Sequence, residues 1–570
     1  MSTSWTYNCS GPSPEWIANS DITGTGVVFS YIITAGIVVV VLALYYFVAY
    51  DPSHDPFLGS KRNSVSRAFY PNPVDALILE DSRRTAISFL GAFGCVPINN
   101  TSFEEAFIRC IIAFSDMQLL TGYSILISGF SQLGSGLQTF YWQVVIGLTW
   151  FSTITHQSCL TALRNHLYLH SSERTWRLAA MATLCVLLAI GLGFTANYDW
   201  AFSTGKNEPN YGDAAICYIR IRLPLGQAFY TMLISVLLIT FSFVVRIVKL
   251  YRFLSVDIFT RARSRVSHWT YTSLRIVHDW SDSSAQPPCL KCMVCYYPLL
   301  AAKLSADLLV DGWTSVFMEI FWVAVAYFWG IYRLIATLQM IGNPTGFLNG
   351  SSDWTFGQVI AMLLLAGPLI TIVESFHSDT GQGKYHPAEN ATHVLSAQNV
   401  PTGQTMIPAS GRSSPILASS RNSRLVGHAT WRSYRSTLRM FCVYCTLMSF
   451  PMLGLLVLAA IGQGSFTGAF VTLGAGRSCY FFLLIPLIGL WEMILLSLAF
   501  DELLNGRKRW ERVTLWLLNT SVCPSSCLFW MLYFFYIDQS TSLVWLGVMQ
   551  ATLFVVYGLV VTLRAVLSPQ

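Results

Sequence analysis

Residues 107–130 read FIRCIIAFSDMQLLTGYSILISGF, residues 131–139 read SQLGSGLQT, and residues 140–156 read FYWQVVIGLTWFSTITH. The first and last of these segments are apolar and long enough to cross a bilayer as helices, and the glycines between them predict a turn. The first helix carries Asp116 and Gln118 near its middle. Because ionisable and polar groups are costly at membrane depth, we expect this helical hairpin to hold the functional site.

The second helix of the hairpin has a polar face. Its members are spaced i, i+3, i+4 and i+7 and so share one side of a helix; they are Thr149, Ser152, Thr153 and His156. Such a face usually lies against other helices, a partner or a water-filled cavity. The alternative is that these groups only bond helices together. We predict a substrate site lined by Gln118, Tyr123, Thr149, Trp150, Ser152 and Thr153.

The composition indicates a membrane protein. Of the 570 residues, 53% are apolar and only 11% are charged, whereas soluble domains average about 25% charged residues. In lipid each long apolar run must form a helix, because a helix satisfies its own backbone hydrogen bonds. The predicted fold is therefore an all-α, polytopic transmembrane bundle. We interpret the net charge of +6 as basic residues that hold loops in the cytosol, not as a nucleic-acid-binding surface.

The apolar runs predict about eleven spans with an external N-terminus and a cytosolic C-terminus, because this topology places nearly every basic cluster in the cytosol. The expected domains are an external tail (1–25), a first membrane part of about seven spans (26–375), a cytosolic linker (376–432) and a second membrane part of about four spans (433–570). The linker is rich in Ser, Gly, Asn, Thr and Pro and cannot build a core, so we expect it to be disordered.

Two sequons and two cysteines fall in segments that this topology places outside the cytosol. We expect glycosylation at Asn8 and Asn349, each of which begins an Asn-X-Ser sequence. Cys9 and Cys217 share the same side, where disulfides form. The sequence is compatible with a bond between them and with two unpaired thiols.

A cluster of cysteines lies in a predicted cytosolic loop, at Cys289, Cys292 and Cys295. Its spacing resembles part of a zinc or iron–sulfur ligand set, but the sequence shows no obvious fourth ligand. Acylated or reduced thiols fit better, so we expect neither a metal nor a cofactor. The sequence also lacks a phosphate-binding loop, a zinc-protease motif and a dinucleotide fingerprint, which leaves ATP-driven and common hydrolase chemistry without support.

Four ionisable residues are expected in the cytosolic half of the membrane, from four different spans: Asp116, His156, Glu319 and Glu492. On neighbouring helices they would converge on one polar cavity. A buried carboxyl that stays protonated can act as a general acid, which suggests Asp116 as the acid and Glu319 or Glu492 as a second acid or base. His156 would orient or shuttle a proton. The competing interpretation is that each group only joins helices.

The hairpin also carries a resemblance. The stretches SDMQLLTGYSILISGF and WQVVIGLTWFSTITH resemble a core shared by multispan integral membrane proteins of filamentous fungi, most specifically over residues 107–170. This implies a fungal membrane protein from a group without a settled activity. The chain is also similar in principle to the membrane-bound terpene and meroterpenoid cyclases of fungi, which protonate an olefin or epoxide with membrane-embedded acids. That similarity implies a role in secondary metabolism.

These observations suggest three functions. The favoured one is a membrane-embedded enzyme that cyclises or isomerises a lipophilic, isoprenoid-type substrate by acid initiation. The second is a transporter or channel that uses the same residues as a proton or substrate path, against which the absence of internal repeats counts. The third is a non-catalytic sensor or scaffold. The expected partners are membrane lipid and a lipophilic small molecule, and the expected location is the endoplasmic reticulum or plasma membrane.

Overall fold

The structure is a computed structural model. It describes residues 7–9, 19–53, 57, 71–92, 101–198, 212–219, 227–282, 292–339 and 354–377, together with short pieces at 438, 494–496, 498, 555–560 and 562. Over these ranges the chain is helical and contains no β-strand, apart from one isolated β-bridge between Gln138 and Ala214. The predicted all-α fold is confirmed for this part of the chain.

Several helices are apolar enough to cross a membrane. The described residues include five helices of sufficient length and hydropathy, which are Ser20–Val48, Phe107–Leu133, Ser171–Asn197, Thr231–Leu250 and Val316–Ile335, and a shorter apolar one at Phe356–Gly367. These agree with an integral membrane protein. The predicted linker 376–432 lies outside the described residues, as do nearly all the spans predicted after it.

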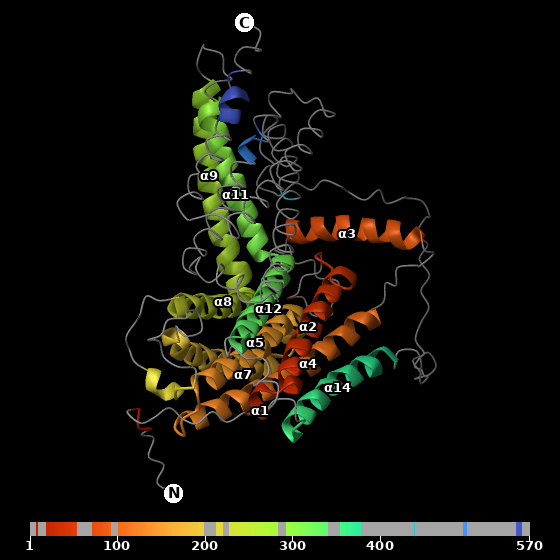
Figure 1. Cartoon of the computed structure of the whole chain (residues 1–570). Coiled ribbons are helices and arrows are strands. Elements are labelled where there is room, and N and C mark those ends of the chain that lie inside the picture. Colours follow the sequence, from red (N-terminus) through yellow and green to blue (C-terminus); the bar gives the residue numbers. More distant parts are fainter. Residues whose placement is uncertain are drawn as a thin grey trace, which may run out of the picture.

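The second helix of the hairpin, α5 (Thr139–Ala162), is the centre of the bundle (Figure 1). Every residue of α5 except Gly147 is buried. The helix packs against α2 (Thr25–Val48), α4 (Thr101–Leu133), α7 (Ser171–Phe194), α8 (Gln227–Leu250) and α12 (Val316–Gln339). Because α5 is surrounded by protein and not by lipid, it can carry polar residues that would be energetically costly on a lipid-facing helix.

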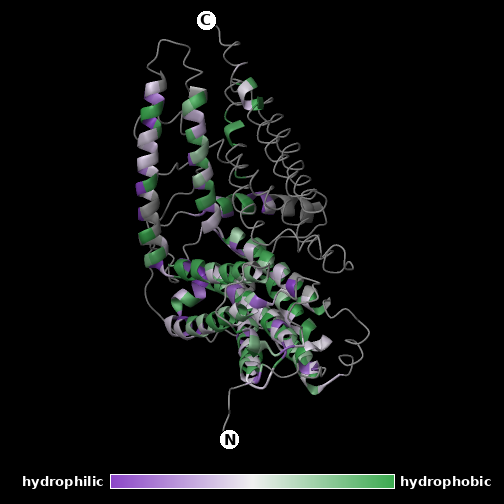
Figure 2. Ribbon diagram, turned by 60° about the vertical axis from the view of Figure 1, so that its left-hand side comes forward, coloured by the Kyte–Doolittle hydropathy of each residue, from purple (hydrophilic) through white to green (hydrophobic). Residues whose placement is uncertain are grey.

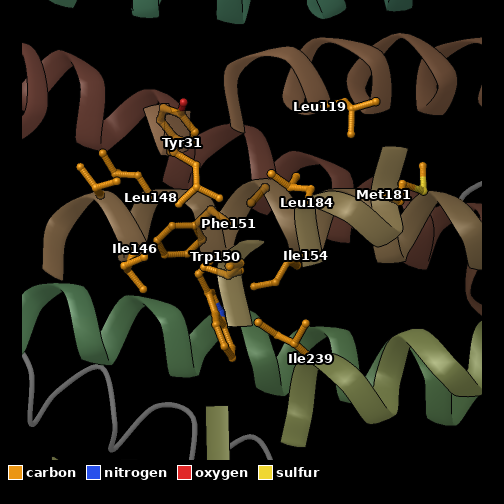
Figure 3. Packing of buried hydrophobic residues seen from close by; sticks show 14 of the residues in the cluster. Tyr31, Leu119, Ile146, Leu148, Trp150, Phe151, Ile154, Met181, Leu184 and Ile239 are labelled. Atoms are coloured by element: carbon orange, nitrogen blue, oxygen red, sulfur yellow. The ribbon is translucent and has the colours of Figure 1, made fainter. Parts of the chain in front are cut away.

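Close packing around α5 depends on glycine and on large apolar side chains. A Cβ atom at Gly122 of α4 would come 2.2 Å from Ser152 Oγ, and one at Gly330 of α12 would come 2.6 Å from the Trp150 ring. Figure 3 shows Trp150, Phe151 and Ile154 of α5 among apolar side chains from the surrounding helices. Small residues at helix contacts let backbones approach closely in a membrane, as the hairpin sequence suggested for Gly122.

The helix α3 (Pro73–Ala92) lies between the first span and the hairpin and was not predicted from the sequence. Asn72 caps it, since the Asn72 side-chain oxygen accepts the backbone N–H of Val74 at 2.8 Å. Proline is well suited to the first position of a helix, where its missing N–H is not needed. The Asn72-Pro73 pair therefore indicates the start of a helix, which the pattern of apolar residues alone does not.

Two further helices extend from the bundle, where the sequence analysis expected a loop. After α8 come the π-helical turn η4 (Phe253–Ile258), α9 (Phe259–Asp282), the turn η5 (Cys292–Tyr296) and α11 (Tyr297–Thr314). Leu274 of α9 and Leu300 and Leu304 of α11 belong to one apolar cluster. Figures 1 and 2 show α9 and α11 side by side, leading away from the other helices.

The remaining described elements are α1 (Ser20–Thr23), α6 (Arg164–Leu169), η1 (Thr195–Asn197), η3 (Ala215–Tyr218) and α14 (Phe356–His377). The helix α14 lies against α2 and α4. There Gln358 Oε1 accepts the backbone N–H of Gly26 at 3.3 Å, and Ser30 Oγ donates to the backbone oxygen of Ala361 at 2.7 Å.

Candidate functional site

Polar side chains on different faces of α5 form two separate networks. The first, called here the His156 network, joins α4, α5 and α7 through Ser115, Asp116, Gln118, Ser152, His156, Cys159, Glu173 and Arg177. The second, called the Glu319 network, joins α5, α6, α8 and α12 through Gln157, Thr161, Arg164, Ser242, Arg246, Lys249 and Glu319.

The deepest part of the His156 network is a serine–histidine pair on α5. Ser152 Oγ donates to the backbone oxygen of Gln118 at 2.5 Å and lies 3.2 Å from His156 Nε2. Since the serine proton is directed to Gln118, the histidine nitrogen must be the donor in the second bond, which assigns the His156 proton to Nε2. The other ring nitrogen, Nδ1, is then an acceptor, and none of the described residues is its hydrogen-bond partner.

The other end of the His156 network is an ion pair between α4 and α7. Arg177 Nη2 donates to Asp116 Oδ2 at 2.9 Å, and Arg177 Nη1 lies 3.6 Å from Glu173 Oε2. The Arg177 side chain is 8% exposed and the Asp116 side chain is 39% exposed. A guanidinium this close to a carboxylate stabilises its charged form. One guanidinium therefore lies between two carboxylates at the start of α7.

Cys159 and Ser115 lie near the ion pair of Asp116 and Arg177. The Cys159 thiol donates to the backbone oxygen of Ile111 at 3.4 Å and lies beside Ser115. Ser115 is adjacent to Asp116 in the chain, and Cys159 is one helical turn from His156.

Several buried atoms of this network have no hydrogen-bond partner among the described residues. These are Ser115 Oγ, Asp116 Oδ1, Gln118 Oε1, His156 Nδ1, Arg177 Nε and Arg177 Nη1. An unsatisfied buried polar group costs about 1–3 kcal/mol, so such groups normally bind water, an ion or a ligand. Their concentration between α4, α5 and α7 marks this interface as the place where a proton or a small polar molecule would bind.

The Glu319 network is arranged differently, because cations surround its one carboxylate. Glu319 is 4% exposed and accepts hydrogen bonds from Thr161 Oγ1 at 2.7 Å, from Arg164 Nη2 at 2.9 Å and from Lys249 Nζ. Arg246 Nε donates to Thr161 Oγ1 at 3.0 Å, and Arg246 Nη2 donates to the backbone oxygen of Glu319 at 3.3 Å. A buried carboxylate is tolerated when it is paired and fully hydrogen-bonded in this way.

The same network continues along α8 and leaves no polar group unmatched. Ser242 Oγ donates to Gln157 Oε1 at 2.7 Å, and Gln157 Nε2 donates to the backbone oxygen of Ile239 at 3.2 Å. The network lies wholly within the described helices, and none of its buried side-chain atoms lacks a partner. We conclude that the Glu319 network is a structural latch between α5, α6, α8 and α12.

A further buried carboxylate, Asp75 of α3, holds the start of α12. It accepts the backbone N–H groups of Val316 at 2.9 Å and Phe317 at 3.1 Å, and the hydroxyl of Tyr46 at 3.0 Å. It thus caps α12 from another helix, where a negative charge also complements the helix dipole. Burial raises the pKa of the Asp75 carboxyl, although these three donors and Lys249 act in the opposite direction.

The residues predicted to line a substrate site are divided between these contacts. Gln118 and Ser152 belong to the His156 network. The Tyr123 hydroxyl donates to the backbone oxygen of Ala180 in α7 at 2.6 Å, and Trp150 Nε1 donates to that of Ala326 in α12 at 2.9 Å. The hydroxyls of Thr149 and Thr153 bond to carbonyls of their own helix.

The predicted quartet of ionisable residues is also divided. Asp116 and His156 belong to the His156 network, and Glu319 belongs to the network on another face of α5. Glu492 lies outside the described residues. Arg177 holds Asp116 at the α4–α7 contact, His156 bonds to Ser152 on α5, and a separate group of cations holds Glu319.

The cysteines and sequons have the following places. Cys9 and Cys217 form a disulfide with a Cα–Cα distance of 5.6 Å. The side chain of Asn8 is exposed, and Asn349 lies outside the described residues. Cys295 is a free thiol, whereas Cys289 and the side chain of Cys292 are not described. In the part of the chain that is described, no group of His, Cys, Asp or Glu could hold a metal ion.

No protein-family model, curated protein or solved structure matches this chain. The function must therefore be argued from the two networks themselves.

The cationic members of both networks were not among the predicted site residues. Arg164, Arg177, Arg246 and Lys249 lie beside predicted spans, where basic residues indicate topology. In the structure Arg164, Arg177 and Lys249 pair with carboxylates, and Arg246 bonds to the backbone oxygen of Glu319. A pattern was available on α8, because Ser242, Arg246 and Lys249 are spaced i, i+4 and i+7 and share one helix face. Basic residues that repeat on one face at the end of a span indicate a buried partner as well as a topology.

Proposed function

We propose that this protein is an integral membrane protein that moves protons, as a transporter or channel, and that the His156 network is its proton path. One observation carries the proposal: Glu173, Arg177 and Asp116 form a row of charged side chains between α7 and α4, and the buried His156 lies on the adjacent helix α5. Unsatisfied polar atoms occur along this row and not in the Glu319 network.

The residue types in the row suit stepwise proton transfer. A carboxylate can accept a proton at Asp116 Oδ1, which has no hydrogen-bond partner among the described residues. Neutralising Asp116 would weaken its bond to Arg177 and leave the guanidinium to Glu173, 3.6 Å away. His156 Nδ1, buried on α5, is an acceptor that also lacks a hydrogen-bond partner in this part of the chain.

The geometry supports this function more than acid-initiated cyclisation, which the sequence favoured. A general acid must be protonated before it reacts, but the cations next to Glu319 stabilise its charged carboxylate. Nor do Ser152 and His156 resemble an activated nucleophile, because the serine proton is directed to a backbone carbonyl and no group orients His156 Nδ1. The lack of internal repeats still counts against a transporter. The enzyme remains the second candidate.

The proposal keeps the predicted topology of eleven spans with an external N-terminus. The Cys9–Cys217 disulfide supports it, because disulfides form outside the cytosol. A location in the endoplasmic reticulum or plasma membrane would allow glycosylation at Asn8 and Asn349. Membership of the fungal multispan group and a role in secondary metabolism remain expectations from the hairpin sequence.

The test is proton flux into vesicles that contain the purified protein and a trapped pH-sensitive dye. Under an imposed membrane potential, the wild type should carry protons faster than protein-free vesicles, and Asp116→Asn and His156→Ala should each slow the flux by about tenfold or more. The control is Ser124→Ala on α4, because Ser124 is exposed and bonds only to its own helix. Flux equal to that of protein-free vesicles, together with conversion of a polyprenyl or epoxidised substrate, would favour the enzyme instead.

A further inference from the structure

The helix α9 has an apolar stripe that is exposed on its surface. The exposed fractions are 61% at Val266, 73% at Trp269, 64% at Ile276 and 55% at Trp280. The spacings of three, seven and four residues place these side chains on one side of the helix. The stripe is separate from the face that packs on α11, where Leu274 is buried.

A second exposed face of α9, beside the stripe, is polar and mainly basic. It repeats every three or four residues and consists of Arg261, Arg265, His268, Thr272, Arg275 and Asp279. Of these, Arg275 makes a long contact of 3.7 Å with Asp279, and both side chains are exposed. An apolar face with tryptophans next to a basic face is typical of helices that lie in the interface of a bilayer.

The apolar surface of α9 begins where a membrane span ends. Thr231–Leu250 is one of the helices apolar enough to cross a membrane. The residues that follow it are also exposed, with fractions of 37% at Tyr251, 62% at Phe253 and 49% at Ile258. In both views of the whole chain, α9 runs across the direction of α8 (Figures 1 and 2). A helix that leaves a span at such an angle can lie along the membrane surface.

We propose that α9 lies on the cytosolic surface of the bilayer and binds anionic phospholipids. Val266, Trp269, Ile276 and Trp280 enter the boundary between headgroups and acyl chains, where tryptophan is favoured. Arg265 and Arg275 contact the phosphate and carboxylate groups of the lipids. The predicted topology places this segment in the cytosol, and the leaflet that faces the cytosol is the anionic one.

Two features of α9 favour a lipid surface over another partner for the stripe: its basic face, and its position directly after a membrane span. A second copy of α9 would bring two basic faces of the same charge together, which opposes pairing. A lipid surface instead complements the arginines and is already present where α8 ends. This inference does not depend on the proposed proton path, since α9 contributes no residue to either network.

The test uses the full-length protein in nanodiscs of phosphatidylcholine, with or without phosphatidylserine. A phospholipid with a photoreactive diazirine near its headgroup is included, and the labelled peptides are identified by mass spectrometry. Peptides that cover Val266–Trp280 should be labelled, and more so when phosphatidylserine is present. Labelling of α2, whose Phe29 and Val40 are 54% and 58% exposed, reports that the protein is inserted.

Two double variants separate the apolar and electrostatic contributions. Trp269→Ser with Trp280→Ser should remove most lipid labelling from α9 and leave that of α2 unchanged. Arg265→Gln with Arg275→Gln should remove the increase caused by phosphatidylserine and keep the remainder. Thr272→Ser, on the polar face, is the matched control and should label like the wild type.

Two results would overturn the proposal. One is an unlabelled α9 in nanodiscs where α2 is labelled normally. The other is a crosslink between α9 peptides of two copies in place of the lipid label, which would assign the stripe to self-association. A variant that fails to insert is recognised by loss of the α2 label. In that case, hydrogen exchange of α9 is measured in wild-type nanodiscs with and without phosphatidylserine. Membrane contact predicts slower exchange of α9 when phosphatidylserine is present.

Discussion

Ser152 Oγ lies 3.2 Å from His156 Nε2, one turn further along the same buried helix, and both residues face α4 and not lipid. The contact is possible because Gly122 of α4 has no side chain at this point. The position of the histidine therefore depends on a glycine in the neighbouring helix.

We predict that Gly122→Ala destabilises the protein. The added Cβ would lie 2.2 Å from Ser152 Oγ, so α4 must move away, and such overpacking costs about 1–3 kcal/mol. The matched control is Gly193→Ala in α7, where nothing lies within 4 Å of the added carbon. Thermal unfolding in detergent should separate the two variants by several degrees, and equal midpoints would argue against this close helix contact.

Glu319→Gln should be more damaging than Asp116→Asn. The first change leaves the buried Arg246 and Lys249 and the partly buried Arg164 beside a neutral side chain. Breaking a buried ion pair in this way costs about 3–5 kcal/mol. Asp116 is 39% exposed and its pair is partly open to solvent, so the second change should cost less.

The measurement is denaturant unfolding of both variants and of the double variant Glu319→Gln with Lys249→Met. Removing one uncompensated cation should restore part of the lost stability, as a double-mutant cycle would reveal. If Glu319→Gln unfolds at the wild-type midpoint, the Glu319 network is not a latch.

The Asp75 cap should make stability depend on pH. Burial raises the pKa of Asp75 from 3.8, so over the interval above 3.8 the folded protein binds more protons than the unfolded chain. The free energy of unfolding contributed by this group is therefore largest below pH 3.8 and falls as the pH rises through the raised pKa. The unfolding midpoints of wild type and Asp75→Asn, measured from acidic to neutral pH, isolate this dependence. The midpoint of the wild type, measured relative to that of Asp75→Asn, should fall as the pH rises. A relative midpoint that rises with pH would contradict the prediction.

Reduction of the Cys9–Cys217 disulfide should loosen the outer end of the hairpin. The bond closes a loop with a sequence separation of 208 residues, and losing a native disulfide typically costs about 2–5 kcal/mol. It holds Tyr7 near Gly136, which has a φ of 89° in the α4–α5 turn. Cys9→Ser with Cys217→Ser should lower the unfolding temperature and mobilise this turn, as measured by hydrogen exchange.

The same bond tests the topology. A membrane-impermeant reductant should reach the disulfide from the non-cytosolic side, as the predicted external N-terminus requires. In sealed vesicles that keep the cytosolic side outward, it should therefore reduce the bond only after the vesicles are opened. Reduction while these vesicles are sealed would place both residues, and the N-terminus, in the cytosol.

Sequence patterns predicted the elements better than their partners. Long apolar runs predicted helices where α2, α4, α7, α8 and α12 are observed, because a helix satisfies its own backbone hydrogen bonds in lipid. They failed for α3 and α9, whose polar composition resembles that of a loop. The predicted spans after residue 432 lie almost entirely outside the described residues and stay predictions.

The sequence predicted some residues of the candidate site and not others, depending on whether a residue was unusual for its segment. Polar residues in an apolar segment, such as Asp116 and His156, attract attention in any sequence of this kind. Arginines and lysines at span ends do not, because the need for cytosolic positive charge explains them without a partner. In the sequence Arg177 and Lys249 are explained as cytosolic positive charges. In the structure each forms an ion pair with a carboxylate.

By itself, the sequence determined that the described chain is helical and largely apolar, and that its hairpin carries polar groups at membrane depth. These are local properties, which depend on residue type and on spacing along one helix. Only the tertiary structure decided that α5 lies at the centre, and that Asp116 pairs with Arg177 while Glu319 lies among cations on another face. Pairing between helices depends on which faces pack together, and many side chains contribute jointly to that choice. The hairpin sequence therefore indicated a functional site, whereas the packing around α5 places Asp116 and Glu319 in two separate networks.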